Sequence, residues 1–284
     1  MERVREVGAP LCIGLDPYVG HIPAIFGPGL AGAKGFCREI VDLACAHGAA
    51  LKPQCALFEA MGWEGVRLLH ALIAQARGKG LPVILDAKRG DIGATAAGYA
   101  TACLGPAPGM DADAVTVSPY MGKDSLEPFL ALAQQNAKGV AVLARTSNPG
   151  ASDVQGLICH DQPVWAHVAN MLAPHTERLL GESGWSGLMV VAGATAPAEA
   201  MRLRHLLPKA LFLVPGYGTQ GASAAQAVAG FVRTPRGLEG GIVNASRALL
   251  FPEAAQAART LADWRTAIQA RMQAARAELA QACA

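Results

Sequence analysis

The sequence predicts a single α/β domain over residues 1–284, folded as a (β/α)8 TIM barrel. Eight short apolar runs recur along the chain, and segments of helical composition separate them. Runs such as Val83-Ile84-Leu85 and Met189-Val190-Val191 are continuously apolar, which is typical of parallel strands covered on both faces. Each run is followed by polar or Gly residues. Eight such units in 284 residues favour a closed barrel over a doubly wound sheet.

The predicted strands are the apolar runs themselves. In chain order they cover residues 11–15, 49–52, 82–86, 114–118, 139–144, 187–192, 211–214 and 241–245. Between the second and third strands, residues 66–73 place apolar side chains at helical spacing, and Gly78 and Gly80 end this helix before Pro82. A helix of this kind packs on the outer wall of a barrel.

Two segments depart from the regular alternation. The connection between the fifth and sixth strands, at about 145–186, is unusually long, and long barrel loops are usually functional or accessory. The Ala-rich stretch 253–284 is interpreted as one or two surface helices without a chemical role. Both segments remain part of one domain in this prediction.

Composition limits the class of protein. Hydrophobic residues make up 52% and charged residues 16% of the chain, so most of it is expected to be buried. The formal net charge is only +2, which is too balanced to hold nucleic acid by its overall field. No apolar stretch is long enough for a membrane span, and no signal peptide is evident. Seven scattered cysteines without metal-ligand spacing predict reduced thiols in a cytoplasmic protein.

The densest group of charges follows the third predicted strand. It reads Asp86-Ala87-Lys88-Arg89-Gly90-Asp91. Side chains alternate along a strand, so Asp86 and Lys88 are expected on one side, and a turn at Gly90 can return Asp91 toward Lys88. The alternative is a surface ion pair beside a helix-capping Asp. Charges at the mouth of an apolar barrel are costly to desolvate, which favours a functional cluster.

A second lysine and a further aspartate belong to the same face of the barrel. Lys52 ends the second strand, next to the third, and can join an alternating array of lysine and aspartate residues with Asp86. Alone it would be interpreted as a solvated strand end. Asp16 ends the first strand before Pro17, where a simple Asp-Pro turn is the alternative.

Near the last two strands the signal changes to Gly and Arg. Residues 214–221 form a Gly-rich loop that opens a helix, and Arg247 follows the eighth strand. Backbone N–H groups and one guanidinium can bind a phosphate, which many barrels place at this corner. The Gly-rich loop alone is weak evidence; the pairing with Arg247 strengthens it. No metal-ligand cluster, pyridoxal site or thiamine site is evident, so no cofactor and no metal are expected.

Together these motifs resemble the orotidine 5′-phosphate decarboxylase family over nearly the whole barrel. Asp86, Lys88 and Asp91 match the family's D-x-K-x-x-D motif, with Ile92 and Thr95 following. The other matching segments come in the family's order: Leu15-Asp16, Leu51-Lys52-Pro53, Thr146-Ser147-Asn148-Pro149-Gly150, Pro215-Gly216, Gly218-Thr219-Gln220-Gly221 and Ser246-Arg247. The chain is most similar to the longer bacterial subgroup.

The resemblance implies a decarboxylation of orotidine 5′-monophosphate to UMP and CO2 in pyrimidine biosynthesis, without a cofactor. It implies that Lys88 donates the proton and that Asp86 lies against the substrate carboxylate. Further implied roles follow the family motif: ribose contacts from Lys52 and Asp16, a pyrimidine contact from Ser147, phosphate contacts from Gln220 and Arg247, and Asp91 with Thr95 reaching into the partner's site in a homodimer.

Two departures and two rival functions accompany this resemblance. A Gly commonly precedes the phosphate-binding Arg, whereas this chain has Ser246, and residues 151–186 lack a counterpart in the shorter family members. A sister enzyme that uses Mg²⁺ and a sugar phosphate, such as a ketogulonate-phosphate decarboxylase or a hexulose-phosphate synthase, shares the charged motif. A barrel that binds a nucleotide without turnover is the second alternative.

Overall fold

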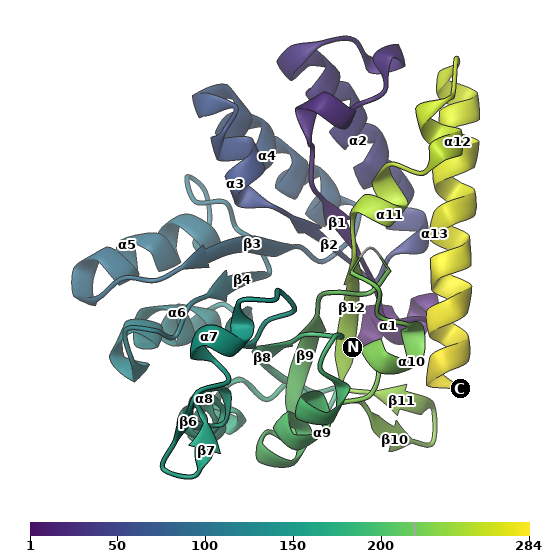
Figure 1. Ribbon diagram of the computed structural model, residues 1–284. Coiled ribbons are helices and arrows are strands. Elements are labelled where there is room, and N and C mark those ends of the chain that lie inside the picture. Colours follow the sequence, from purple (N-terminus) through teal and green to yellow (C-terminus); the bar gives the residue numbers. More distant parts are fainter. Residues whose placement is uncertain (219) are drawn as a thin grey trace.

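The computed structural model describes residues 1–218 and 220–284. Eight parallel strands lie at the centre of the molecule, and helices surround them (Figure 1). The strands are β1 (Leu11–Leu15), β2 (Ala50–Pro53), β3 (Ile84–Arg89), β4 (Ala114–Val117), β5 (Gly139–Arg145), β8 (Ser186–Ala192), β9 (Ala210–Val214) and β12 (Gly241–Ala245). The predicted barrel fold is confirmed.

The strand order shows how the barrel closes. Hydrogen bonds connect the strands in the order β2-β1-β12-β9-β8-β5-β4-β3. Single parallel bridges from Leu51 to Val83 and from Gln54 to Asp86 join the two remaining edges, β2 and β3. All eight strands therefore point the same way, and their carboxyl ends meet at one mouth.

The predicted strands coincide with the observed ones. Those at 11–15 and 241–245 have the predicted bounds, and the others shift by one to three residues at an end. The largest shift is in β3, which runs through Arg89 instead of ending at Asp86. Their continuous apolar character has the expected cause, because successive residues alternate between an outer core under the helices and an inner core within the barrel.

Thirteen α-helices occur in the described part of the chain. They are α1 (Glu2–Val7), α2 (Gly29–His47), α3 (Cys55–Glu59), α4 (Gly62–Gly78), α5 (Gly93–Leu104), α6 (Lys123–Gln135), α7 (Ala151–Val154), α8 (Val164–Leu172), α9 (Pro197–Leu206), α10 (Ala224–Ala227), α11 (Arg247–Leu250), α12 (Glu253–Gln256) and α13 (Leu261–Cys283). The predicted helix at 66–73 lies within α4, which ends at Gly78. None of these helices is long and apolar enough to span a membrane.

The long connection after β5 has its own small elements. It holds α7, a two-stranded hairpin of β6 (Ile158–Cys159) and β7 (Gln162–Pro163), and then α8. A second hairpin, β10 (Val232–Thr234) and β11 (Gly237–Glu239), precedes β12. In Figure 1 α7 is drawn among the strand ends at the centre of the view, whereas the β10–β11 hairpin lies at the edge.

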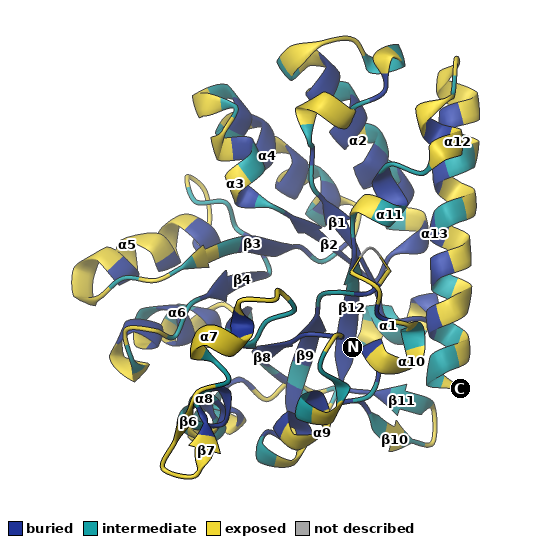
Figure 2. Cartoon of the chain, in the orientation of Figure 1, coloured by how far each residue is buried: buried dark blue, intermediate teal, exposed yellow. Residues whose placement is uncertain are grey.

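The carboxyl-terminal helix α13 is built into the barrel wall. Five of its residues at helical spacing are fully buried: Trp264, Ile268, Met272, Ala275 and Leu279. The Trp264 ring lies 4.8 Å from that of Phe26 and 5.7 Å from that of Phe36, between centroids. Figure 2 shows its remaining face largely exposed. The expected surface helix thus also contributes core, which its Ala-rich sequence did not indicate.

Candidate active site

Three charged side chains meet at the carboxyl ends of β2 and β3. Lys52 Nζ donates to Asp86 Oδ2 at 2.5 Å, and Lys88 Nζ donates to Asp86 Oδ1 at 2.5 Å. Lys52 is 5% and Asp86 6% exposed, whereas the side chain of Lys88 is 46% exposed. We call these three residues the charged cluster. One buried carboxylate therefore holds two ammonium groups, of which only that of Lys88 is open to the mouth.

The charge on Asp86 is set by these lysines. Burial alone would raise the pKa of the Asp86 carboxyl, but the ammonium groups of Lys52 and Lys88 outweigh burial and hold this pKa well below its usual range. For Lys52, burial would lower the pKa, yet the carboxylates of Asp86 and Asp16 raise it. Asp86 and Lys52 are consequently ionised at neutral pH, as a site that stabilises a developing charge requires.

Sequence reasoning missed two polar residues that donate hydrogen bonds to the charged cluster. Gln54 Nε2 donates to Asp86 Oδ2 at 3.2 Å, and Thr116 Oγ1 donates to Asp86 Oδ1 at 3.0 Å. With both lysines, the Asp86 carboxylate accepts four hydrogen bonds. The available signal was a single hydroxyl, that of Thr116, in the otherwise apolar strand Ala114–Val117.

Among the described residues of one chain, Asp91 and Thr95 form no side-chain hydrogen bond or ion pair with the charged cluster. After Gly90 the chain continues outward into α5, and Asp91 Oδ1 accepts a hydrogen bond from the N–H of Ile92 at 2.8 Å. Among the described residues Asp91 has no ion-pair partner, and Thr95 is exposed in the first turn of α5. The described residues contain no ion pair between Asp91 and Lys88 within a single chain.

Asp16 lies on the other side of Lys52, near the end of β12. Its Oδ1 is buried without a hydrogen-bond partner in the described structure, as are Asn244 Oδ1 and Ser246 Oγ. Gly14 makes room for Asn244 and Ser246, because a Cβ at Gly14 would lie 2.6 Å from Ser246 Cβ and 3.1 Å from Asn244 Oδ1. These acceptors fit a ligand that brings hydroxyl donors.

Ser147 and Gln220 converge at the Gly-rich loop after β9. Gly216 has a φ of 104°, and a Cβ there would lie 3.0 Å from Gln220 Oε1 and 3.1 Å from Ser147 Cβ. Only glycine fits this close approach in a left-handed conformation. Thr219 of the predicted loop lies outside the described residues. The loop is followed by α10, whose cap is Ser223.

Arg247 begins α11 directly after β12. It is exposed, and the salt bridges of the described residues do not include it. Its guanidinium is therefore available to an anion on the same side of the mouth as the Gly-rich loop.

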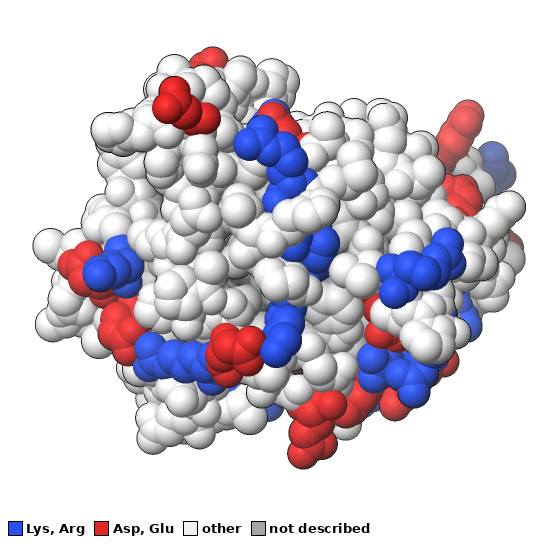
Figure 3. Space-filling model, turned by 90° about the horizontal axis from the view of Figure 1, so that it is seen from below, with Lys and Arg blue, Asp and Glu red and all other residues white. Residues whose placement is uncertain are grey.

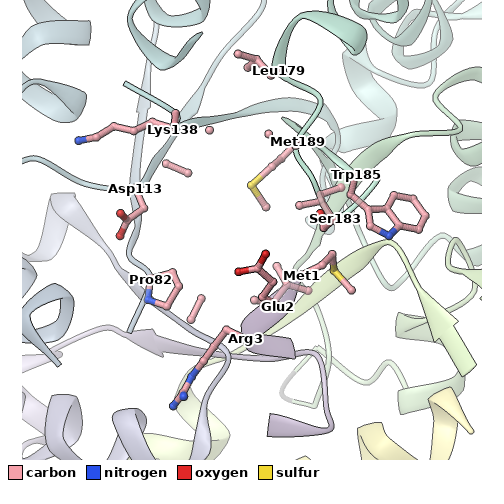
Figure 4. A pocket seen from close by; sticks show the side chains of 18 of the residues that line it. Met1, Glu2, Arg3, Pro82, Asp113, Lys138, Leu179, Ser183, Trp185 and Met189 are labelled. Atoms are coloured by element: carbon pink, nitrogen blue, oxygen red, sulfur yellow. The ribbon is translucent and has the colours of Figure 1, made fainter. Parts of the chain in front are cut away.

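A cavity of about 860 Å³ lies at the opposite end of the barrel (Figure 4). Several of the polar side chains that line it have hydrogen-bond partners. Arg3 donates to Glu6 and to the Cys45 carbonyl, and Lys138 donates to the Leu104 carbonyl at 2.6 Å. Asp113 accepts from the Val83 N–H at 2.8 Å. These hydrogen bonds stabilise the fold at this end of the barrel.

Comparison with known proteins points to one family. The family model for "Orotidine 5′-phosphate decarboxylase / HUMPS family" matches residues 9–260. Orotidine 5′-phosphate decarboxylase of Rhodopirellula baltica is 35% identical, covering 94% of this chain and 93% of its own. That of Haloarcula marismortui is 41% identical, covering 88% and 84%.

A solved structure shows the same architecture. The putative orotidine-monophosphate-decarboxylase of Toxoplasma gondii superposes with a TM-score of 0.83 at 30% identity, covering 99% of this chain and 93% of the other. The match extends over the strands that carry the charged cluster and over the Gly-rich loop. The chain belongs to the orotidine 5′-phosphate decarboxylase / HUMPS family.

Proposed function

We propose that this protein decarboxylates orotidine 5′-monophosphate to UMP and CO2 in the cytoplasm, as a step of pyrimidine biosynthesis. The curated relatives described above carry this activity in their names. The observation that carries the proposal is the charged cluster, in which the ammonium of Lys88 is the open member beside a buried carboxylate. All seven cysteines are free thiols, which supports a reducing compartment.

The reaction explains why an ammonium is needed. The bond between C6 of the pyrimidine and the carboxylate carbon breaks, CO2 leaves, and the electron pair stays on C6 in the plane of the ring. Lys88 Nζ stabilises this negative charge and then transfers a proton to C6, after which the amine regains a proton from water. Asp86 holds the Lys88 ammonium at 2.5 Å and lies beside the substrate carboxylate. No metal ion or cofactor takes part in the proposed reaction.

The remaining residues bind the nucleotide. Lys52 and the unpaired Asp16 contact the ribose hydroxyls, and Ser147 contacts the edge of the pyrimidine. Gln220 and Arg247 hold the phosphate, with Gly216 allowing Gln220 and Ser147 to approach each other. The phosphate is remote from C6, so its binding energy serves to hold the substrate against the charged cluster.

We further propose that the active unit is a homodimer in which Asp91 and Thr95 complete the partner's site. Asp91 lacks a cation partner within the described part of its own chain. Apolar and aromatic side chains are exposed at α5 and before α6, with Ile92 56%, Tyr99 36% and Tyr120 87% exposed. Figure 2 shows that α5, which carries Thr95, is largely uncovered. A second copy on α5 would cover these side chains and bring Asp91 to a lysine.

The test of the function is the loss of orotidine 5′-monophosphate absorbance with chelator-treated protein. We expect turnover without added metal, and the same rate after Mg²⁺ is restored. Turnover only with Mg²⁺ and a sugar phosphate would assign the chain to the sister enzymes. Binding of UMP without any turnover would assign it to the nucleotide-binding class.

A further inference from the structure

The register between strands β3 and β4 shifts at Asp86 and Lys88 of the charged cluster. Leu85 pairs with Val115 and Arg89 pairs with Val117, so β3 advances four residues while β4 advances two. Three residues of β3, Asp86 to Lys88, therefore lie opposite a single residue of β4. That residue is Thr116.

Lys88 adopts a backbone conformation that side chains other than glycine's disfavour. Its φ is 45°, in the left-handed region. The regular alternation of a strand is thus interrupted between Asp86 and Lys88, and the irregular backbone brings both side chains into one ion pair of 2.5 Å. Such a conformation persists only where neighbouring groups hold it.

The hydroxyl of Thr116 contacts all three residues of this irregular segment. Its oxygen accepts hydrogen bonds from the N–H of Ala87 at 3.0 Å and from that of Lys88 at 2.9 Å, and it donates to Asp86 Oδ1 at 3.0 Å. Thr116 is 1% exposed, so water cannot replace these bonds. One donor and two acceptor sites are all that a hydroxyl has, and each is used here.

We propose that Thr116 is a positioning residue for the decarboxylation: its hydroxyl fixes the backbone of Lys88 and the carboxylate of Asp86 relative to each other. This inference rests on the proposed function. Thr116 lies behind the carboxylate and acts on the substrate only through Asp86 and Lys88. Without the hydroxyl, two backbone N–H groups lose their acceptor, and the Lys88 side chain is no longer held where charge develops on C6.

The chain offers a matched control for the loss of a buried hydroxyl. Ser186 is the first residue of β8, at the end of the barrel away from the mouth, and it is fully buried. Its Oγ donates to the Thr176 carbonyl at 2.6 Å and accepts from the Leu188 N–H at 3.0 Å. Ser186→Ala removes comparable hydrogen bonds without touching the charged cluster. This variant shows how far kcat falls when buried hydrogen bonds are lost away from the charged cluster.

The experiment compares kcat, KM and the dissociation constant of UMP in wild type, Thr116→Val, Thr116→Ser and Ser186→Ala. Thr116→Val keeps the shape but removes the hydroxyl, and we expect kcat to fall about 10- to 100-fold, the scale of hydrogen bonds to charged groups, with UMP affinity within about threefold. Thr116→Ser should retain most of the wild-type kcat. Ser186→Ala should lower only the melting temperature.

Two results would overturn the inference: a Thr116→Val kcat within about twofold of wild type, or an equal loss of kcat in Ser186→Ala. If Thr116→Val does not fold, Thr116→Ala at low temperature replaces it, and a kcat for this variant equal to that of Thr116→Ser would also refute the role. An inactive wild type would instead refute the proposed function, so the two failures are distinguishable.

Discussion

Asp86 is the residue through which the two lysines of the charged cluster are connected. Its buried carboxylate accepts hydrogen bonds from two lysines, an amide and a hydroxyl. Breaking a buried ion pair by removing one partner typically costs about 3–5 kcal/mol, because the other charge stays buried. Asp86 therefore contributes to the stability of the fold as well as to the reaction. We expect its contribution to the free energy of unfolding to depend on pH.

Asp86→Asn should change how stability depends on pH in acid. Because the folded pKa of Asp86 lies below its unfolded value, the unfolded state binds more protons between the two, and stability is lost as pH falls through this window. One such group contributes a slope of up to about 1.4 kcal/mol per pH unit below about pH 4. Urea unfolding between pH 5 and pH 2 should give a shallower slope for the variant. Equal slopes would contradict the depressed pKa.

Arg247 should affect binding of the phosphate alone. Arg247→Ala removes an exposed guanidinium without an ion-pair partner in the described structure, so we expect UMP to bind about 10- to 100-fold more weakly and uridine to bind unchanged. Calorimetric titration of both ligands measures this. Arg236→Ala, on the hairpin that precedes β12, is the control of equal charge. An equal loss of uridine affinity would refute the phosphate role.

At the scale of elements, the strands were predictable and the irregularities were not. Continuous apolar runs such as Val140–Leu143 identify strands because both faces of a parallel barrel are covered. The role of Thr116 depends on a pairing between β3 and β4 that skips two residues, which no local pattern reveals. The position of Asp91 likewise depends on the direction that α5 takes after Gly90.

The helix α13 illustrates a second limit of sequence reasoning. Alanine is frequent on both of its faces, so its apolar pattern is weak, yet Trp264 and Ile268 are fully buried. Their burial depends on Phe26 and Phe36, far away in the sequence. These distant segments come together only when the barrel closes, so the local sequence of either segment cannot predict the contact.

Trp264→Ala tests whether α13 is part of the core. Removing a fully buried Trp should lower the free energy of unfolding by about 3–5 kcal/mol. The kcat of the folded variant should be unchanged, because the helix lies outside the mouth. Gln273→Ala, on the exposed face of the same helix, should change stability by less than about 0.5 kcal/mol. Equal stability of both variants in urea would contradict the packing described above.

At the scale of the whole molecule, the two ends of the barrel differ in their polar groups. The cavity of Figure 4 lies at the opposite end of the barrel from the charged cluster, whereas the buried, unpartnered oxygens of Asp16, Asn244 and Ser246 lie at the mouth. On the face seen in Figure 3, basic and acidic side chains are interspersed, so no field of a single sign extends over it. This distribution agrees with a small-molecule substrate and with the net charge of +2.

If the proposed homodimer shares its sites, two inactive variants should complement each other. Lys88→Ala and Asp91→Ala should each be inactive alone, but a mixed dimer contains one site with both native residues. Random exchange of subunits in equal amounts should restore about a quarter of the wild-type activity, since half of the dimers are mixed and each has one native site. No recovery after exchange has been verified by mass spectrometry would contradict the shared site.

The central claim is that the ammonium of Lys88 stabilises and protonates C6, and the most direct measurement is the decarboxylation rate of Lys88→Ala. We expect kcat to fall at least about 10⁴-fold, the combined scale of a lost proton donor and a lost stabilising charge. UMP should still bind, and Lys209→Ala, which removes an exposed lysine before β9, should react at the wild-type rate. Turnover of Lys88→Ala near that of wild type would contradict the account.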